Sequence, residues 1–325
     1  MLENLLLLLA GLVGLFFGGN WLVRGASNLA MSFGVSILII ALTFVAIGTS
    51  MPELLVSVQA ALAGKSDLAI GNVLGSNIAN IGLILGATGL ITPLSVKAVL
   101  LRREIPIMIL FTVFTYILTL DGQIGRVDGL LLLFSFAGFN TMFYYLAKKE
   151  QDARDQLLAD VDDEQITSEL GRPKEFLYLM LGIAALVIGS RLMVEGAVNI
   201  ARLVGISELV IAITLVAFGT SLPELAASLS AAFHKKTDLA IGNIVGSNIA
   251  NLLLILGVTS LLRPIAVSRA EVQFEFLVMI AFAVMLIPFA RHQKFGRRQS
   301  AVFLGAYIAF IIYSLTADSL QILIQ

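Results

Sequence analysis

The chain has 325 residues, of which 58% are hydrophobic and 13% are charged, and its formal net charge is −1. A soluble domain carries roughly a quarter charged residues, so this composition, with a mean hydropathy of +0.95, excludes a soluble globular protein and predicts an integral membrane protein. No basic stripe is present to bind nucleic acid. There is no cysteine, and the two histidines, His234 and His292, sit beside charged residues, so the membrane interior offers only oxygen ligands.

Ten apolar stretches are long enough to cross a bilayer, which takes about 20 residues of helix. The first follows Met1-Leu2-Glu3-Asn4 and lacks the basic region and small-residue cleavage site of a signal peptide, so we interpret it as a retained span. The predicted spans are Leu5–Val23, Val35–Ala63, Leu68–Ile91, Ile105–Leu120, Leu130–Leu146, Phe176–Val194, Ile206–Phe233, Leu239–Leu262, Phe274–Phe289 and Ala301–Leu315. We therefore expect an all-α polytopic membrane protein with ten transmembrane helices.

One long hydrophilic stretch, residues 148–174, divides the chain into halves of five spans each. We predict a first five-helix unit over residues 1–147, a cytoplasmic linker over 148–174 and a second unit over 175–325. The halves are copies, because a shift of 171 residues aligns Gly18–Glu104 with Gly189–Glu275 without a gap.

The repeat is strongest where Gly48–Gly86 matches Gly219–Gly257 at 26 of 39 positions. Because each unit holds an odd number of spans, the second copy must enter the membrane with the opposite orientation. Inverted repeats are typical of secondary transporters that work by alternating access.

The charges of the loops predict the orientation of the chain. With the N-terminus outside, roughly fourteen basic residues fall on the inner side and about five on the outer side, as the positive-inside rule requires. The equivalent turns of the two copies follow the same trend, with Lys65 alone in the first and Lys235 and Lys236 in the second. Both termini are therefore expected outside.

Each copy carries Gly-Thr-Ser-x-Pro-Glu in the middle of its second span, at Gly48–Glu53 and at Gly219–Glu224. Proline lacks an N–H and clashes with the preceding turn, so each helix should break there and leave carbonyl oxygens without partners. At membrane depth such oxygens need water, protein or a cation. Freed carbonyls, a hydroxyl and a carboxylate within one turn suit a hard cation.

The serine and glutamate of this motif also fit a local capping box, in which Ser50 and Glu53 would cap the second half-helix. That interpretation is preferred for a surface helix. In the membrane a buried carboxylate costs at least about 2.5 kcal/mol, so two of them at equivalent depth, Glu53 and Glu224, favour a functional site; capping and ligation remain compatible.

The third span of each copy adds a second motif, Gly75–Asn80 and Gly246–Asn251, both reading Gly-Ser-Asn-Ile-Ala-Asn. Its serine and last asparagine are four residues apart and share a helix face. We interpret Asn77 and Asn248 as hydrogen-bonding links between helices. Without thiolate or imidazole, zinc, copper and iron are poor candidates, and Mg²⁺ retains its waters, which leaves Ca²⁺ and Na⁺. Two glutamates would neutralise one Ca²⁺ or two Na⁺.

The paired motifs resemble the alpha repeats of the sodium/calcium exchangers, in the calcium:cation antiporter superfamily, and this chain looks like a prokaryotic member. The resemblance covers essentially the whole chain. It implies a secondary antiporter in the inner membrane, needing no cofactor, in which the first and sixth spans slide. It also implies the ligands of three ion sites. Ca²⁺ would bind Glu53 and Glu224 with the carbonyls of Thr49 and Thr220. One Na⁺ would bind Ser50, Ser76, Glu224 and the Ala46 carbonyl, another would bind Ser221, Ser247, Glu53 and the Ala217 carbonyl, and Asn80 and Asn251 would line the middle.

Several alternatives stay open. Some relatives place an aspartate where this chain has Asn251, and that aspartate is tied to potassium use, so its absence argues against potassium dependence. A calcium/proton antiporter of the same superfamily is the nearest rival, although such relatives usually carry Gly-Asn-x-x-Glu. A cation channel is less favoured, since a single chain with an inverted repeat suits alternating access as a monomer. An enzyme is not expected, because two glutamates alone form no familiar catalytic set.

Overall fold

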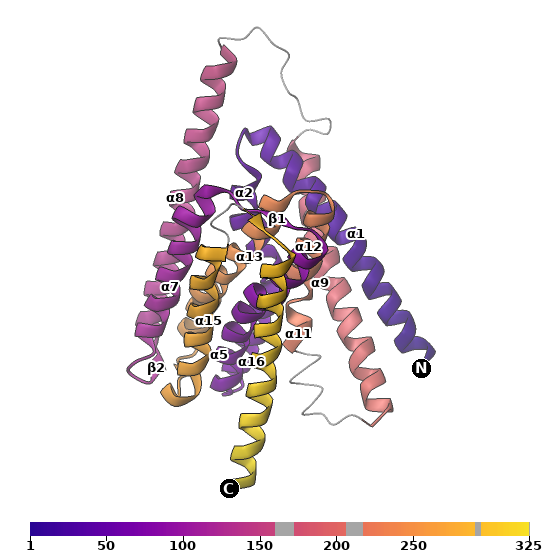
Figure 1. Cartoon of the computed structure of the whole chain (residues 1–325), viewed down its shortest axis with the longest axis vertical. Coiled ribbons are helices and arrows are strands. Elements are labelled where there is room, and N and C mark those ends of the chain that lie inside the picture. The colour runs from indigo at the N-terminus through magenta and orange to yellow at the C-terminus, as the bar shows by residue number, and fades with distance from the viewer. Residues whose placement is uncertain (160–171, 206–216, 290–293, 325) are drawn as a thin grey trace.

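The computed structural model describes residues 1–159, 172–205, 217–289 and 294–324, which are mostly helical (Figure 1). The middle of the predicted linker (160–171) and the beginning of the predicted seventh span (206–216) lie outside the described residues.

Five helices of the described chain are long and apolar enough to cross a bilayer. They include α1 (Leu2–Phe33), α8 (Arg126–Ala159) and α9 (Arg172–Leu203), and the continuous helical runs Ser66–Ile91 and Thr237–Leu262. A sixth candidate is a broken pair, Ile37–Thr49 and Met51–Leu62, whose two parts meet at 44°. The predicted count of ten spans remains a prediction.

The described elements recur in the two halves at the same 171-residue shift found in the sequence. The first half contains α2 (Ile37–Ile40), the π-helical segment η1 (Ala41–Val45), α3 (Ala46–Thr49), α4 (Met51–Leu62), α5 (Ser66–Ala79), the π-helical η2 (Asn80–Ile84), α6 (Leu85–Ile91), η3 (Leu100–Glu104) and α7 (Ile105–Leu118). The second contains α11 (Ala217–Thr220), α12 (Leu222–Phe233), α13 (Thr237–Ala250), the π-helical η5 (Asn251–Ile255), α14 (Leu256–Leu262), α15 (Arg269–Phe289) and α16 (Arg297–Ile324).

Two helices extend beyond the predicted spans. Helix α1 continues for ten residues past Val23 and ends where Gly34, with φ 67°, adopts the left-handed conformation that terminates helices. Helix α8 continues to Ala159, well into the predicted hydrophilic linker. Hydropathy locates the end of an apolar stretch, whereas a helix ends only where a cap or breaker occurs, and the Lys, Glu, Gln, Ala and Leu residues after Leu146 are good helix formers.

Four two-residue strands link the halves, a feature that the all-helical expectation did not contain. Strand β1 (Leu94–Ser95) pairs with β4 (Lys294–Phe295), and β2 (Gln123–Ile124) pairs with β3 (Ile265–Ala266), both antiparallel. Each ladder joins one strand of each half, so the second half is fastened to the first at two places.

Helices α1 and α9 lie side by side along most of their length (Figure 1). Glycines at intervals of seven residues, Gly11, Gly18 and Gly25 in α1 and Gly182, Gly189 and Gly196 in α9, let the backbones approach. A Cβ on Gly25 would lie 2.4 Å from the Leu179 nitrogen, and one on Gly182 would lie 2.4 Å from the Leu22 nitrogen. These helices are therefore in backbone contact.

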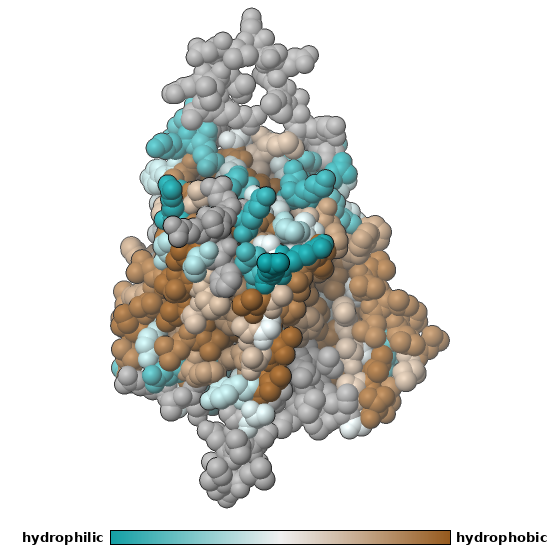
Figure 2. All heavy atoms as spheres, in the orientation of Figure 1, coloured by the Kyte–Doolittle hydropathy of each residue, from teal (hydrophilic) through white to brown (hydrophobic). Residues whose placement is uncertain are grey.

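The centre of the molecule is formed by the two runs that carry the Gly-Ser-Asn motifs. The apolar window of Thr237–Leu262 is 94% buried and that of Ser66–Ile91 is 72% buried, against 17% to 33% for α1, α8 and α9. The outer helices therefore present apolar side chains to lipid, visible as the brown surface in Figure 2. Hydrophilic residues gather at the end where α8 and α9 are joined, and the two termini lie toward the opposite end (Figures 1 and 2).

Candidate cation site

Both second spans break at the predicted position. Helix α3 ends at Thr49 and α4 begins at Met51, with Pro52 in its first turn. In the other half α11 ends at Thr220 and α12 begins at Leu222, with Pro223 in its first turn. A proline fits at the start of a helix, where its missing N–H would have no partner, so each motif ends one half-helix and begins the next.

The local capping box does not form at either break. Ser50 and Ser221 occupy the N-cap positions of α4 and α12, but neither side chain caps its own helix. Instead, the Ser50 hydroxyl donates to Glu224 Oε1 at 3.0 Å, and the Ser221 hydroxyl donates to Glu53 Oε1 at 3.4 Å. The serine of each half thus binds the glutamate of the other half, and the capping interpretation is wrong.

The two carboxylates lie in the interior of the molecule. Glu53 and Glu224 are each 1% exposed, and the second oxygen of each, Oε2, has no hydrogen-bond partner among the described residues. The Oδ1 atoms of Asn80 and Asn251 are buried without a partner in the same way. Four oxygen acceptors in a buried site with no donor to satisfy them make a chemically suitable environment for a cation.

The asparagines of the third spans fix the direction of these oxygens. Asn80 Nδ2 donates to Asn248 Oδ1 at 2.9 Å, and Asn251 Nδ2 donates to Asn77 Oδ1 at 3.0 Å. Asn77 and Asn248 also exchange bonds with each other's carbonyls, at 3.2 and 3.4 Å. Because the amide nitrogens of Asn80 and Asn251 are used in this way, their oxygens are left for another ligand. Both residues begin π-helical segments, which recur at functional sites.

The remaining predicted ligands are distributed over the same elements. Thr49 Oγ1 lies 3.5 Å from Ser247 Oγ, and Ser247 Oγ lies 3.5 Å from the Ala46 carbonyl. Ser76 Oγ lies 3.5 Å from Ser221 Oγ. Ala217 and Thr220 begin and end α11, directly before Ser221. Thr49, Ser50, Ser76, Ser221 and Ser247 are all at most 5% exposed.

The carbonyls around the breaks are not all free. The Gly219 carbonyl accepts a bond of 2.6 Å from the Ser190 hydroxyl of α9, and the Ala46 carbonyl accepts the Ser50 amide at 3.1 Å. A proline removes the N–H that would bond a carbonyl of the preceding turn, and at Gly219 the Ser190 hydroxyl donates in its place. The Gly219 carbonyl is therefore paired, contrary to the expectation that such carbonyls need a cation, and the unpaired oxygens found at the site belong to side chains.

Sequence reasoning missed a second asparagine in each third span. Asn72 donates to Ser57 Oγ at 2.9 Å and to the Glu53 carbonyl at 3.1 Å. Its equivalent, Asn243, donates to Ser228 Oγ at 3.3 Å and accepts the Thr49 hydroxyl at 3.2 Å. The signal was present, because both residues follow a glycine at equivalent positions of the repeat.

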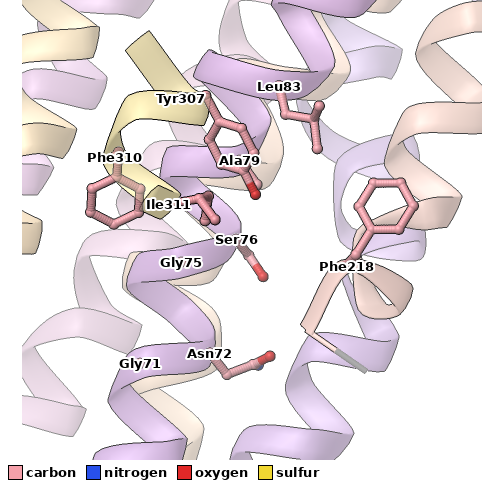
Figure 3. A pocket seen from close by; sticks show the side chains of 10 residues that line it. All are labelled: Gly71, Asn72, Gly75, Ser76, Ala79, Leu83, Phe218, Tyr307, Phe310 and Ile311. Carbon is pink, nitrogen blue, oxygen red and sulfur yellow. The ribbon is translucent and has the colours of Figure 1, made fainter. Parts of the chain in front are cut away.

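The two halves differ in how closely the broken helix packs on the third span. In one half α3 and η1 lie against α13: a Cβ on Gly246 would be 2.7 Å from Ala46 Cβ and 2.8 Å from Leu42 Cα. In the other half no described heavy atom lies within 4 Å of a Cβ on Gly71 or Gly75. A cavity of about 370 Å³ occupies this place, lined by Asn72 and Ser76 of α5 and by Phe218 of α11 (Figure 3). In the described part of the chain, Gly246 is therefore in backbone contact, whereas Gly71 and Gly75 border the cavity.

Broken helices in both halves, converging buried carboxylates and unpaired oxygens within a lipid-facing bundle define a cation-transporting membrane protein. The family model for the sodium/calcium exchanger protein matches residues 3–145 and 174–316. The chain belongs to this family, whose members are transporters and not enzymes.

Similar proteins match over nearly the whole chain. A putative antiporter CaxA from Alkalimonas amylolytica is 39% identical, covering 95% of this chain and 98% of its own. The sodium/calcium exchanger MaX1 of Methanosarcina acetivorans is 36% identical, covering 95% and 97%. A solved structure of the sodium-calcium exchanger NCX_Mj, soaked with 10 mM Na⁺ and zero Ca²⁺, superposes with a TM-score of 0.82 at 34% identity, covering 96% and 98%.

Proposed function

We propose that this protein exchanges Na⁺ for Ca²⁺ across the membrane by alternating access. The observation that carries this proposal is the set of four buried acceptors that have no partner among the described residues, Oε2 of Glu53 and Glu224 and Oδ1 of Asn80 and Asn251. The two glutamates supply two negative charges, which match one Ca²⁺ or two Na⁺, and both ions prefer oxygen ligands. The names of MaX1 and NCX_Mj favour Na⁺ as the coupling ion.

The ligands of this proposed site come from both halves. Ca²⁺ would bind the two glutamates and the carbonyls of Thr49 and Thr220. The hydroxyls that bind the opposite glutamate's Oε1, Ser50 and Ser221, would take part in the Na⁺ sites with Ser76, Ser247 and the carbonyls of Ala46 and Ala217. Ser50 lies within 3.0 Å of Glu224 and Ser221 within 3.4 Å of Glu53, which supports a shared site in which Na⁺ and Ca²⁺ compete.

The proposed architecture is ten spans in two inverted five-helix repeats. The recurrence of described elements at a shift of 171 residues and the cross-half strand ladders support it. With the N-terminus outside, the contact between η1–α3 and α13 would lie on the cytoplasmic side of the site, and the cavity beside α5 would lie on the outer side.

The decisive experiment is transport of calcium-45 into proteoliposomes that hold the purified protein. An outward-directed Na⁺ gradient should drive Ca²⁺ uptake, and dissipating that gradient should stop it. Glu53→Gln should abolish the flux, because one of two charged ligands is lost. Undiminished flux in this variant would refute the proposed site.

The same vesicles separate the coupling ions. Uptake driven by a pH gradient with no Na⁺ present would identify a calcium/proton antiporter instead. With Asn251 in place of an aspartate, we expect Na⁺-driven uptake to need no K⁺. Single-channel currents in a planar bilayer would identify a channel. We further propose that the protein acts as a monomer in the inner membrane of a prokaryote, with both termini outside.

A further inference from the structure

Helix α9 contacts the broken helices of both halves at the glycine of their Gly-Thr-Ser-x-Pro-Glu motifs. A Cβ on Gly48 would clash with the side chain of Ile183, and a Cβ on Gly219 would clash with that of Val194. Ile183 and Val194 are eleven residues apart on α9, which corresponds to about 16 Å along a helix. This one helix, which contains the sixth predicted span, therefore packs on both breaks.

At the second break the contact includes a hydrogen bond. An α-helix directs the N–H of each residue at the carbonyl four residues before it, and Pro223, which has no N–H, lies four residues after Gly219. The Gly219 carbonyl instead accepts a bond of 2.6 Å from the hydroxyl of Ser190, which is 3% exposed. A side chain of α9 thus takes the place of the N–H that the proline lacks.

The equivalent residue of the first half cannot form this bond. The 171-residue shift places Gly19 of α1 at the position of Ser190, and glycine has no side chain that could donate. A Cβ on Gly19 would lie 2.8 Å from Ser230 Cβ of α12, so this position is packed against another helix. The hydroxyl is therefore a feature of the second half alone, where it links α9 to the end of α11.

We propose that Ser190 is a positioning residue of the cation site, through which α9 holds the ligands of α11 in place. This inference rests on the proposed function, in which Ca²⁺ binds the Thr220 carbonyl and one Na⁺ binds the Ala217 carbonyl. The Gly219 carbonyl lies between these two along the chain. Fixing its direction restricts the orientation of the neighbouring peptide groups, and the ligands are then oriented before a cation arrives.

The direct test is the variant Ser190→Ala, which removes the bond and introduces no larger side chain. One buried hydrogen bond is worth about fivefold in an equilibrium constant. We therefore expect calcium-45 to bind to the purified, detergent-solubilised variant about fivefold more weakly than to the parent. Unchanged affinity would overturn the proposal.

Ser260→Ala is the matched control, because it removes a bond of the same kind away from the site. Ser260 is fully buried, and its hydroxyl donates to the Leu256 carbonyl of its own helix, α14, at 2.7 Å. We expect this variant to have a lower melting temperature and the calcium-45 affinity of the parent. A merely structural role for Ser190 would give the same pattern in Ser190→Ala, and that result would contradict a positioning role.

The proline provides a second, independent test. Pro223→Ala restores the N–H that a helix directs at the Gly219 carbonyl, so the Ser190 hydroxyl should then matter less. We expect Ser190→Ala to lower calcium-45 affinity about fivefold in the parent and to have little effect in the Pro223→Ala background. The same loss in both backgrounds would count against the proposal.

Two further measurements keep this comparison decisive. If Pro223→Ala folds but binds no cation, the melting temperatures of the parent, the two single variants and the double variant give the same comparison. If it does not fold, Ser190→Thr, which keeps the hydroxyl, replaces it and should bind calcium-45 like the parent. None of these assays involves transport. Weaker binding in Ser190→Ala with no Na⁺-driven flux in the parent would refute only the proposed exchange, whereas a parent that binds no calcium-45 would refute both proposals.

Discussion

At the scale of single residues, hydrogen bonds between the two halves hold the site together. Ser50 binds Glu224, Ser221 binds Glu53, and Asn77 and Asn248 bind each other's carbonyls. Each of these contacts crosses from one copy of the repeat to the other. Neither half can therefore assemble the cation site without its partner, and a single substitution should affect ligands contributed by both.

The first prediction concerns the charges of the site. Glu53→Gln and Glu224→Gln should each lower Ca²⁺ affinity about ten- to a hundredfold, because interactions with a charged group are worth about 1.5–3 kcal/mol. Direct binding of calcium-45 to the detergent-solubilised protein measures this. Asp67→Asn, an exposed carboxylate in the first turn of α5, is the control and should bind like the parent; equal losses in all three variants would contradict the assignment.

A second prediction concerns the asparagine links. Asn77→Leu leaves the Asn251 amide and the Asn248 carbonyl without their present partners at 3.0 and 3.2 Å. Each buried polar group left unpaired costs about 1–3 kcal/mol, so thermal unfolding should occur at a clearly lower temperature. Asn140→Leu on α8 is the matched control, since its amide bonds only to the Phe136 carbonyl of its own helix at 2.9 Å. Equal melting temperatures would refute a linking role for Asn77.

At the scale of helices, glycine determines which elements touch and which remain apart. The α1–α9 pair is in backbone contact at its glycines, and α13 is in contact with η1 and α3 at Gly246. Gly71 and Gly75 of α5 face an open cavity instead. Among the described residues, the glycine of the Gly-Ser-Asn motif is thus in backbone contact in the second half and borders a cavity in the first.

Alanine at Gly246 and alanine at Gly75 should have different consequences. In Gly246→Ala the new Cβ would meet Ala46 and Leu42 at less than 3.0 Å, and such overpacking costs about 1–3 kcal/mol. Gly75→Ala meets no described atom within 4 Å. We expect a lower melting temperature for Gly246→Ala and little change for Gly75→Ala; similar values for both would mean that the two sides are not differently packed.

The α1–α9 contact can be tested in the same assay. A Cβ on Gly182 would lie 2.4 Å from the backbone nitrogen of Leu22, so Gly182→Ala must push the helices apart. We expect it to lower the melting temperature by several degrees and to slow transport, since the family resemblance implies that the first and sixth spans slide. Gly138→Ala on α8, where no described atom lies within 4 Å, should do neither.

At the scale of the whole molecule, the described chain has apolar outer helices and a central pair of buried helical runs. The termini lie toward one end and the junction of α8 and α9 toward the other (Figure 1). In an intact cell, an impermeant maleimide should therefore label Glu3→Cys and leave Lys149→Cys unlabelled until the membrane is permeabilised. Because the chain itself has no cysteine, only the introduced residue can react with the maleimide. The reverse labelling pattern would overturn the predicted orientation.

Much of the site could be predicted from the sequence because both copies of the repeat carry the same two motifs. Proline in the interior of a helix lacks the N–H and clashes with the preceding turn, so the breaks before Pro52 and Pro223 could be predicted without tertiary information. The hydrogen-bond partner of the Ser50 hydroxyl was not predictable, because the same serine can form a capping box in its own helix or bond a glutamate of the other half. The contacts of Asn72 and Asn243 were missed although the repeat marks both positions, because the sequence does not indicate which groups an asparagine side chain in a helix will bond.

The sequence by itself determined the membrane setting, the duplication, the helix breaks and the oxygen-only ligand set, since these follow from composition, periodicity and local backbone chemistry. Only the tertiary structure decided which half's serine binds which glutamate and how far α1 and α8 extend. Two copies with nearly the same local sequence have nearly the same local preferences. The choice of hydrogen-bond partners therefore depends on how the two halves pack against each other.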